Sequence, residues 1–525
     1  MSEARAMTPG RSPVARWAFI LIAILPFQLG LWRHLTVGGE EATGFLGYDA
    51  PYYAANGRET FERGNGFAHP NPYDPDPAAP VIYFHWLTWW FGFGIKVLHC
   101  DPGVFYVVTG LVAALLGGWL TLRLVEVVLP DPRGRSLLFL LTMWGGGALC
   151  LGAVGYSLGT GRPAFEDLFI IDYPAGWWFA NWGRNFVLPT ESVYHALTAL
   201  LWLGVLRGRW GMALGGAAAL AATHPFSGAQ HLAILGAWTG YLALRDRTAA
   251  ALGRAALVGL MLALFAAYYF WFLNLYPTHR QLQEGWANAW PTSLPFLLLA
   301  TGPVAALAVW RLKARQWRLD DRERFLLVAG CLTVGLMKHD WFISPHQPIH
   351  FGRGYNWLPF WLIALPQIQT AALALAGAAR RWLARGFMAV AVALCLFDNA
   401  AFLGRTWTDG EQGNHLIEPA LREMFAWMDA ARLDGVLLCA DSRLSYLSAT
   451  YTGVRPYIGH LANTPGVRLR WQEITGWQRR GEIWAGFDRI DYILIRPGDQ
   501  PALPAGESWR ELHRNDGFIL LGRAR

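Results

Sequence analysis

Charged residues are scarce in this 525-residue chain: Asp, Glu, Lys and Arg make up 15% of it, against roughly 25% in ordinary globular domains. Hydrophobic residues make up 54%, and they fall in long runs. A run of about 20 apolar residues has the length of a helix that crosses a bilayer. This composition excludes an ordinary soluble enzyme and predicts a polytopic α-helical membrane protein.

Cysteine is also scarce, and its five copies show no paired spacing. They lie mostly in or beside hydrophobic segments, so the pattern favours neither a disulfide framework nor a zinc site. The sequence contains no P-loop, and no G-x-G-x-x-G follows a predicted strand. No loop predicted to face the cytoplasm is long enough for a nucleotide-binding domain. We therefore expect an activated donor substrate to come from the membrane or from the outer side.

Basic residues cluster in short loops between the apolar runs, and the net charge is +7. This distribution is typical of cytoplasmic loops and does not indicate nucleic acid as a partner. It orients the chain with a cytoplasmic N-terminus. Arg5, Arg11 and Arg16 precede the first apolar run, 17–32, and no small-residue cleavage site follows it, so we expect a retained signal-anchor.

The later apolar runs alternate consistently if 81–99, which is rich in aromatic residues, lies along the outer interface instead of spanning the membrane. A first outer loop then covers 36–101 and a second covers 159–189. The basic loops all face the cytoplasm in this arrangement. About eleven spans result, at 17–35, 102–128, 137–158, 191–206, 211–222, 230–244, 255–275, 294–310, 325–343, 356–378 and 386–403.

The tail of the chain is charged and contains no run of span length. It predicts a small α/β domain on the outer face. A helix is expected at 417–431, with strands at 435–440, 492–495 and 517–521. The predicted domains are a transmembrane domain, 1–404, and an extracytoplasmic domain, 405–525.

Asp49 lies directly after the first span, in a segment rich in Tyr. An Asp followed by Ala-Pro is a good helix N-cap, worth about 1 kcal/mol, and capping alone is one explanation of it. A carboxylate at the membrane surface also suits a general base for an acceptor hydroxyl, or a ligand of a divalent metal ion. The explanations are compatible, because a cap leaves one carboxylate oxygen free.

Cationic candidates gather in the other outer loops. Lys338 lies at the outer end of a span, where an ionisable residue usually pairs or serves a site, so an ion pair with Asp340 and a phosphate-binding patch are both open. The patch would include nearby donors in one short loop, His346, Gln347, His350 and Arg353. Arg184, amid aromatic residues of the second outer loop, either grips a phosphate or extends to lipid headgroups.

Further polar residues complete the set of candidates. A second acid is sought among Glu166, Asp167 and Asp172, with solvated surface as the alternative. The other pocket candidates are Tyr52, Tyr53, Arg58, His85, Gln347 and His224. For a lone histidine near a helix end, the alternative is a hydrogen-bonded structural role.

The first outer loop contains Asp-x-x-Tyr-Tyr-x-x-x-x-Arg, from Asp49 to Arg58, and is followed by Pro80-Val-Ile-Tyr83. This order resembles the polytopic C-type glycosyltransferase (GT-C) superfamily. Gln347-Pro-Ile-His-Phe351 and the tail stretch 446–460 resemble bacterial members that have an outer C-terminal domain. The resemblance implies a sugar donor on a polyprenyl phosphate, transfer on the outer face, and Asp49 as the base.

The chain departs from that superfamily at two positions. Many relatives carry a second acid directly after the first, where this chain has Ala50. The usual Arg of a Gln-x-x-Arg-Phe pattern is His350 here, so we expect the phosphate contact at Arg353.

The resulting hypothesis is a glycosyltransferase of the plasma (bacterial inner) membrane that moves a sugar from a polyprenyl-phosphate donor to a glycan, lipid or protein acceptor. One alternative is a transporter or flippase for a lipid-linked saccharide, which favours inverted repeats and ionisable groups at mid-membrane; the sequence shows neither. Another is a non-catalytic assembly subunit whose tail binds a partner. No cofactor is specified, and a divalent metal ion is left open.

Overall fold

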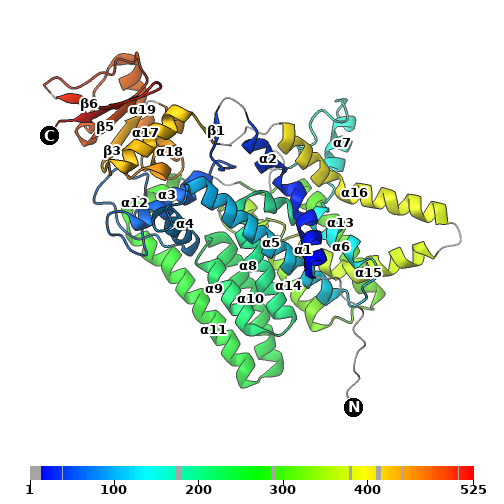
Figure 1. Cartoon of the computed structure of the whole chain (residues 1–525). Coiled ribbons are helices and arrows are strands. Elements are labelled where there is room, and N and C mark those ends of the chain that lie inside the picture. The colour runs from blue at the N-terminus through cyan, green and yellow to red at the C-terminus, as the bar shows by residue number, and fades with distance from the viewer. Residues whose placement is uncertain are drawn as a thin grey trace.

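A computed structural model describes residues 13–37, 40–172, 180–285, 290–377, 381–408, 415–439, 441–506 and 508–524. Arg5, Arg11 and the aromatic stretch 173–179 of the predicted second outer loop lie outside the described residues. The molecule is a bundle of helices with a small sheet domain at one end, formed by the last part of the chain (Figure 1).

Six helical segments of the described chain are long and apolar enough to cross a membrane. They are Pro13–Leu35 (α1, η1 and α2), Pro102–Val128 (α5), Ala249–Leu275 (α11 and the turns after it), Leu294–Ala314 (α13), Leu358–Ala376 (α15) and Trp382–Thr408 (most of α16, Arg381–Thr408). A seventh span results if α6 (Arg135–Trp144) and α7 (Leu149–Gly159), which are bent by 55°, count as one. The chain is a multi-pass membrane protein.

Four more helices occupy the remaining predicted spans: α8 (Pro189–Leu206), α9 (Trp210–Ala221), α10 (Pro225–Asp246) and α14 (Asp321–Met337). With 12 residues, α9 is short for a span, because about 20 residues cross a bilayer. The total of eleven spans therefore stays a prediction. Helix α8 packs against both α5 and α9, and it buries side chains as large as Tyr194 and Trp202.

The segment 36–101, predicted as the first outer loop, carries two short helices, α3 (Ala50–Phe61) and α4 (Trp86–Lys96). They cross at Gly57 and Gly92, where a Cβ on Gly92 would lie 2.0 Å from the Gly57 carbonyl oxygen, so this approach requires glycine. With 11 residues, α4 is too short to span, as the interfacial interpretation requires. Asp49 occupies the N-cap position of α3, but its side chain makes no capping hydrogen bond. Capping alone is therefore the wrong explanation of Asp49.

The tail forms a five-stranded sheet in the order β4-β3-β5-β7-β6. Its strands are β3 (Val436–Cys439), β4 (Arg455–Pro456), β5 (Tyr492–Ile495), β6 (Trp509–Arg514) and β7 (Ile519–Arg523), with helices α17 (Pro419–Ala430), α18 (Ser442–Tyr451) and α19 (Val467–Arg480). Strand β3 is parallel to β4 and β5, while β7 pairs antiparallel with β5 and β6. The predicted helix and three strands correspond to α17, β3, β5 and β7. Strands β4 and β6 are additional, one too short and the other too polar to show as an apolar run.

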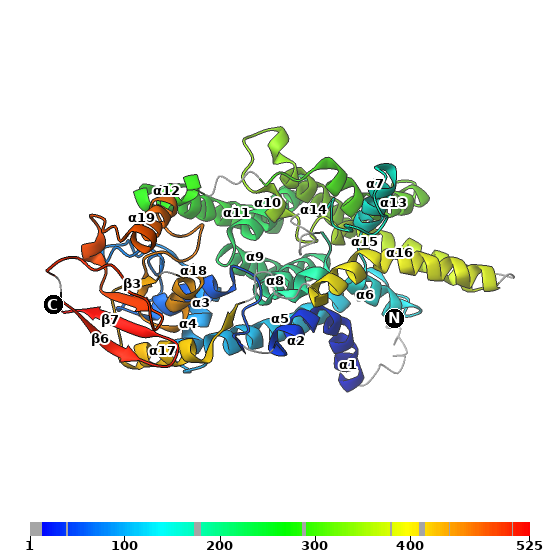
Figure 2. The same ribbon diagram turned by 90° about the horizontal axis from the view of Figure 1, so that it is seen from above.

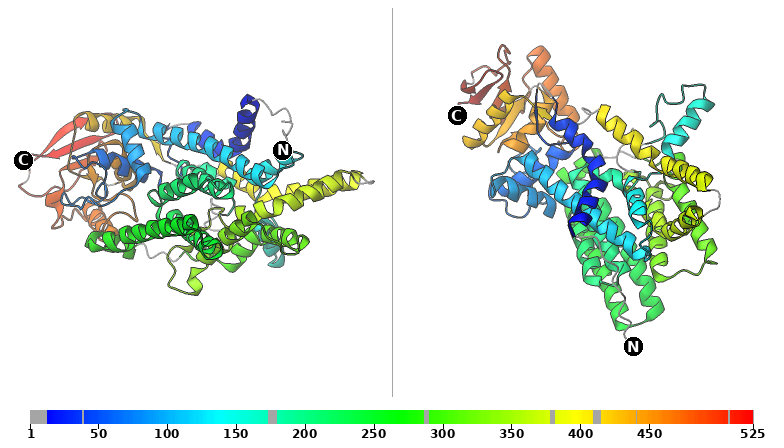
Figure 3. Two further views of the ribbon diagram at one scale, coloured as in Figure 1. Left: turned by 90° about the horizontal axis from the view of Figure 1, so that it is seen from below. Right: turned by 45° about the vertical axis from the view of Figure 1, so that its right-hand side comes forward.

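The tail domain packs on the first outer loop, at the end of the bundle (Figures 1 and 2). Helix α18 lies on α3, and β1 (Glu41–Ala42) pairs antiparallel with β2 (Leu416–Ile417). On the opposite side of the molecule, α16 runs out from the bundle (Figure 3).

Buried ion pairs join the two parts. The Arg455 side chain, 7% exposed, donates to Glu59 at 2.9 Å, and Arg58 is paired with Asp429 and donates to the Tyr451 carbonyl at 3.0 Å. A buried charge is costly unless it is paired. Separating the tail from the loop would break these pairs and leave Arg58 and Glu59 only their partners within the loop, Glu62 and Arg63, so the contact is a fixed part of the fold.

We expect Arg455→Met to lower the stability of the purified protein by about 3 kcal/mol, because it removes one member of a buried pair. The measurement is the midpoint of thermal unfolding in detergent. The matched control is Arg496→Met, whose pair with Glu418 in the same domain is exposed and is expected to contribute about 1 kcal/mol or less. Equal shifts for the two variants would contradict a buried docking contact.

Candidate active site

Asp49 is hydrogen-bonded to His460 of the tail domain. Its Oδ1 lies 2.9 Å from Nε2 of His460. The other ring nitrogen, Nδ1, accepts from the Ala462 backbone N–H at 3.2 Å and from the Asn463 side-chain amide at 3.0 Å. Since Nδ1 accepts, Nε2 carries the proton and donates it to Asp49. In the described part of the chain, no donor bonds to the second oxygen, Oδ2.

The Asp49 side chain is 58% exposed, yet it lies among so many protein atoms that desolvation alone would raise its pKa. The hydrogen bond from His460 and the electrostatic interactions with His460, His350 and Arg353 outweigh that effect, and the pKa lies below its ordinary value. Asp49 is therefore ionised at neutral pH.

Aromatic side chains from both parts of the chain surround the dyad. The Tyr446 hydroxyl donates to the Tyr48 carbonyl at 2.7 Å and accepts from the Tyr52 N–H at 3.1 Å. The rings of Tyr48 and Tyr52 lie 4.8 and 5.2 Å from the His460 ring. Of these, Tyr52 is a predicted pocket residue, and Tyr446 and His460 belong to the tail stretch that resembles the superfamily.

Arg353, in the loop before α15, is buried and lies close enough to Asp49 for the two charges to interact. Burial raises the pKa of Tyr53. The charge of Asp49 also raises it, while the charge of Arg353 lowers it, so Tyr53 lies close to both charged groups. Burial lowers the pKa of Arg353 itself to about 10, and the charge of Asp49 acts in the opposite direction. The structure thus brings together six predicted residues, Asp49, Tyr52, Tyr53, His224, His350 and Arg353.

A set of buried partners holds Arg353 in place. It forms an ion pair with Glu191, in the first turn of α8, where the helix dipole favours an acid. Its Nη2 donates to Nδ1 of His350 at 2.7 Å and lies 3.4 Å from Nε2 of His224. The adjacent Gly354 has φ +73°, and a Cβ there would lie 2.7 Å from the backbone of Trp182. This tight turn places Arg353 above α8.

The rest of the predicted cationic patch is placed next to this group but is bonded differently. Lys338 donates to Asp340 at 2.9 Å and to the Thr292 carbonyl at 2.8 Å, which is the ion-pair alternative. Gln347 is buried before the 3-10 turn η6 (Pro348–Phe351), and its φ is +46°. His346 is exposed, and its backbone N–H donates to Nε2 of His339 at 2.9 Å.

Arg184 lies in a separate cluster. It is fully buried and paired with Asp172 at 2.6 Å, and it donates to Asn399 at 3.2 Å and to the Asp398 carbonyl at 3.3 Å. These contacts tie the second outer loop to α16. The structure does not bring Arg184 or Asp172 to Asp49.

The remaining candidates also lie apart from the dyad. Glu166 and Asp167 are exposed, and Asp167 accepts from the Phe169 N–H at 2.9 Å. Arg58 is turned toward the tail domain through Asp429. His85 precedes α4, and its ring lies 6.4 Å from that of Tyr269.

The acids and histidines of the site do not make a metal-ligand set. Among the described residues, no three His, Cys, Asp or Glu side chains come together in a way that would hold an ion. The Asp49–His460 pair supplies two such groups, and so does the Glu191–His195 pair, in which Oε2 of Glu191 lies 4.0 Å from Nδ1 of His195.

Two residues of the site are not among the candidates predicted from the sequence, Glu191 and His460. A signal for Glu191 exists, because an acid at the outer end of a span needs a partner. His460 ends the tail stretch 446–460 that carries the resemblance, but that stretch does not indicate its role. The partner of His460 is 411 residues away in the chain, and no local pattern reports such a contact.

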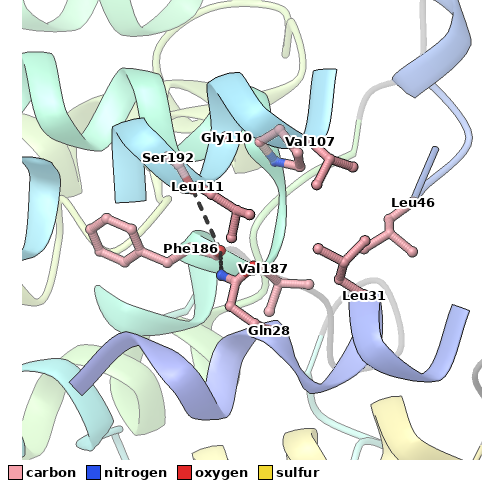
Figure 4. Close-up of a pocket in the computed structure, with 10 residues that line it drawn as sticks. Gln28, Leu31, Leu46, Val107, Gly110, Leu111, Phe186, Val187 and Ser192 are labelled. Atoms are coloured by element: carbon pink, nitrogen blue, oxygen red, sulfur yellow. Dashed lines mark hydrogen bonds between the residues drawn. The ribbon is translucent and has the colours of Figure 1, made fainter. Parts of the chain in front are cut away.

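A small apolar pocket lies between α2 (Leu29–Leu35), α5 and the start of α8 (Figure 4). Gln28 donates across it to the Phe186 carbonyl at 3.0 Å, and Ser192 donates to the same oxygen at 3.4 Å. None of the predicted site residues lines this pocket. Asp49 is not among its lining residues.

No family model and no curated protein matches the chain. Among solved structures, it is similar to ArnT from Cupriavidus metallidurans in the apo state, with 14% identity, a TM-score of 0.48, and coverage of 97% of this chain and 98% of that one. The same protein bound to undecaprenyl phosphate gives 15%, 0.46 and the same coverages.

The archaeal oligosaccharyltransferase AglB from Archaeoglobus fulgidus, in complex with an inhibitory peptide and a dolichol-phosphate, is also similar. Its identity is 13% and its TM-score 0.44, over 91% of this chain and 69% of that one.

Proposed function

We propose that this protein is a membrane glycosyltransferase that moves a sugar from a polyprenyl-phosphate donor to an acceptor hydroxyl on the outer face of the membrane. The observation that carries the proposal is an ionised, half-exposed carboxylate, Asp49, which is hydrogen-bonded to His460 and whose charge interacts with the buried guanidinium of Arg353. The sugar and the lipid phosphate come from the resemblance of the first outer loop to the C-type superfamily. The acceptor is a glycan, a lipid or a protein.

Asp49 has the properties of a general base. It is ionised, one oxygen is held by His460, and Oδ2 is the oxygen directed to an incoming group. In the transfer step, Oδ2 takes the proton of the acceptor hydroxyl while that oxygen bonds to the anomeric carbon. A positioned base of this kind contributes about 10²–10⁴-fold to a rate.

Arg353 supplies the positive charge that the leaving group requires. As the bond between the anomeric carbon and the phosphate oxygen breaks, its electron pair stays with the phosphate, whose negative charge increases. A cation already fixed by Glu191 and His350 stabilises this developing charge without reorganising. We assign Arg184 and Lys338 to structural ion pairs, because Arg184 is paired with Asp172 and Lys338 with Asp340.

Asp49→Asn is expected to lower transfer by about 10²–10⁴-fold, because an amide does not accept the proton. The measurement is transfer from a synthetic polyprenyl-phosphate sugar by protein reconstituted in liposomes, with circular dichroism to verify folding. Asp76→Asn is the matched control: this acid is exposed in the same loop and caps only the Ala78 N–H. A folded Asp49→Asn protein with undiminished turnover would remove Asp49 as the base.

Arg353→Lys is expected to lower kcat by about 10²–10³-fold with a smaller change in KM, because the lost donors act on charge that develops in the transition state. Arg184→Lys is the matched comparison, since Arg184 is equally buried but belongs to the Asp172 cluster. It should lower the unfolding temperature and leave kcat per folded molecule unchanged. If Arg184→Lys lost kcat and Arg353→Lys kept it, the phosphate site would lie in the second outer loop.

A further inference from the structure

The group that orients the proposed base belongs to the other domain. His460 lies after β4 in the tail, whereas Asp49 precedes α3 at the membrane surface. The two side chains meet at 2.9 Å, and the His460 side chain is only 3% exposed. A transmembrane domain without this tail would keep Asp49 but would lack its hydrogen-bond donor.

We propose that His460 is a positioning residue for Asp49, so that the tail domain completes the active site. The inference rests on the proposed function of Asp49 as the base. His460 donates Nε2–H to Oδ1, which fixes the rotation of the carboxylate and leaves Oδ2 as the oxygen that takes the proton. The histidine acts on the reaction through Asp49 and need not touch the substrate.

The surroundings of His460 are built for that one orientation. Ala462 and Asn463 both donate to Nδ1, which excludes the tautomer that would direct an acceptor nitrogen at Asp49. The turn itself is closed by Thr464, whose hydroxyl accepts from the Gly459 N–H at 3.1 Å and donates to the His460 carbonyl at 2.9 Å. On the loop side, the Tyr48 hydroxyl accepts from the Leu461 N–H at 2.8 Å. The ring is thus fixed from both domains.

Among the described residues, none of the other titratable groups near Asp49 donates a hydrogen bond to its carboxylate. Burial lowers the pKa of His350 and of His415 to about 4, so both are neutral near pH 7. Burial raises the pKa of the neighbouring tyrosines, which stay neutral as well: Tyr48, Tyr52, Tyr53, Tyr73 and Tyr446. Arg353 remains charged, but among the described residues its bonds go to Glu191 and the histidines near it, not to Asp49.

The sign of the pH effect follows from these contacts. The hydrogen bond from His460 lowers the pKa of Asp49, while desolvation raises it. Without the donor, the pKa of Asp49 rises, and the base becomes protonated at a higher pH. The acid limb of the rate profile must therefore move to higher pH when the donor is removed, which a merely structural loss would not produce.

The experiment compares His460→Ala with His460→Gln in the full-length protein, using the liposome transfer assay from pH 4 upward. We expect His460→Ala to lower kcat/KM about 10–100-fold near neutral pH, as for a misplaced catalytic group, and to move the acid limb to higher pH. The amide of His460→Gln reaches the Nε2 position and is expected to restore most of both. His513→Gln is the matched control, because His513 stacks on Trp427 elsewhere in the tail, with ring centroids 4.4 Å apart.

A double variant tests whether His460 acts through Asp49. Asp49→Asn/His460→Ala should be no slower than Asp49→Asn alone, because there is no carboxylate left to position. A double variant slower by the full factor of His460→Ala would overturn the inference, and so would a folded His460→Ala protein with wild-type rate and pH profile.

Infrared titration separates a failure of this inference from a failure of the proposed function. The carboxyl band that is lost in Asp49→Asn reports protonation of Asp49 without any turnover. It should appear at higher pH in His460→Ala than in the wild type, and an unchanged band would overturn the pairing. An active Asp49→Asn protein would instead reject Asp49 as the base, whatever the band shows.

Discussion

The contact between the first outer loop and the tail domain is the constraint on which the rest of this structure depends. The loop contains Arg58 and Glu59, two charges that are buried beneath the tail. A buried charge must be paired, and besides Glu62 and Arg63 in the loop itself the partners are Asp429 and Arg455 of the tail. The same contact brings His460 to Asp49. Docking of the domain and assembly of the site are therefore one event.

Buried arginines serve two different purposes on the outer side of the bundle. Arg184 is surrounded by Asp172, Asn399 and the Asp398 carbonyl, so its charge is used to join a loop to α16. Arg353 is also paired, with Glu191, but Asp49 lies within range of its field. The difference is not in burial, since both side chains are nearly inaccessible. It lies in their neighbours: Asp172 and Asn399 bind Arg184, whereas Arg353 also interacts with the charge of Asp49.

The placement of Arg353 shows how local backbone geometry controls a site at the membrane edge. Gln347 and Arg353 both have φ +46°, and Gly354 packs on the backbone of Trp182. These positions make a tight outer turn between α14 and α15 possible. This loop conformation places the Arg353 guanidinium against Glu191 in the first turn of α8, where the helix dipole stabilises the acid. An ion pair formed there is rigid, which suits stabilisation of charge in a transition state.

Much of the architecture could be read from the chain because it depends on local patterns. Apolar length predicts α5, α13 and α15, and the aromatic run before His99 predicts an interfacial helix, found as the 11-residue α4. The short apolar runs of the tail correspond to β3, β5 and β7. Bilayer thickness and strand periodicity act on neighbouring residues, so single segments report them. The number of spans is less readable, since a 12-residue helix such as α9 is apolar without having span length.

The candidate site divides along the same line. Asp49, His350 and Arg353 stand out in the sequence, because ionisable residues are rare in so apolar a chain and collect at the ends of spans. Their chemical partners, His460 and Glu191, do not, and Lys338 and Arg184 look equally suited to a phosphate until their acids are seen. Sequence alone determined a multi-pass helical protein with acidic and basic groups in its outer loops. Only the tertiary structure decided which charges pair with each other, because pairing depends on distances between segments that are hundreds of residues apart.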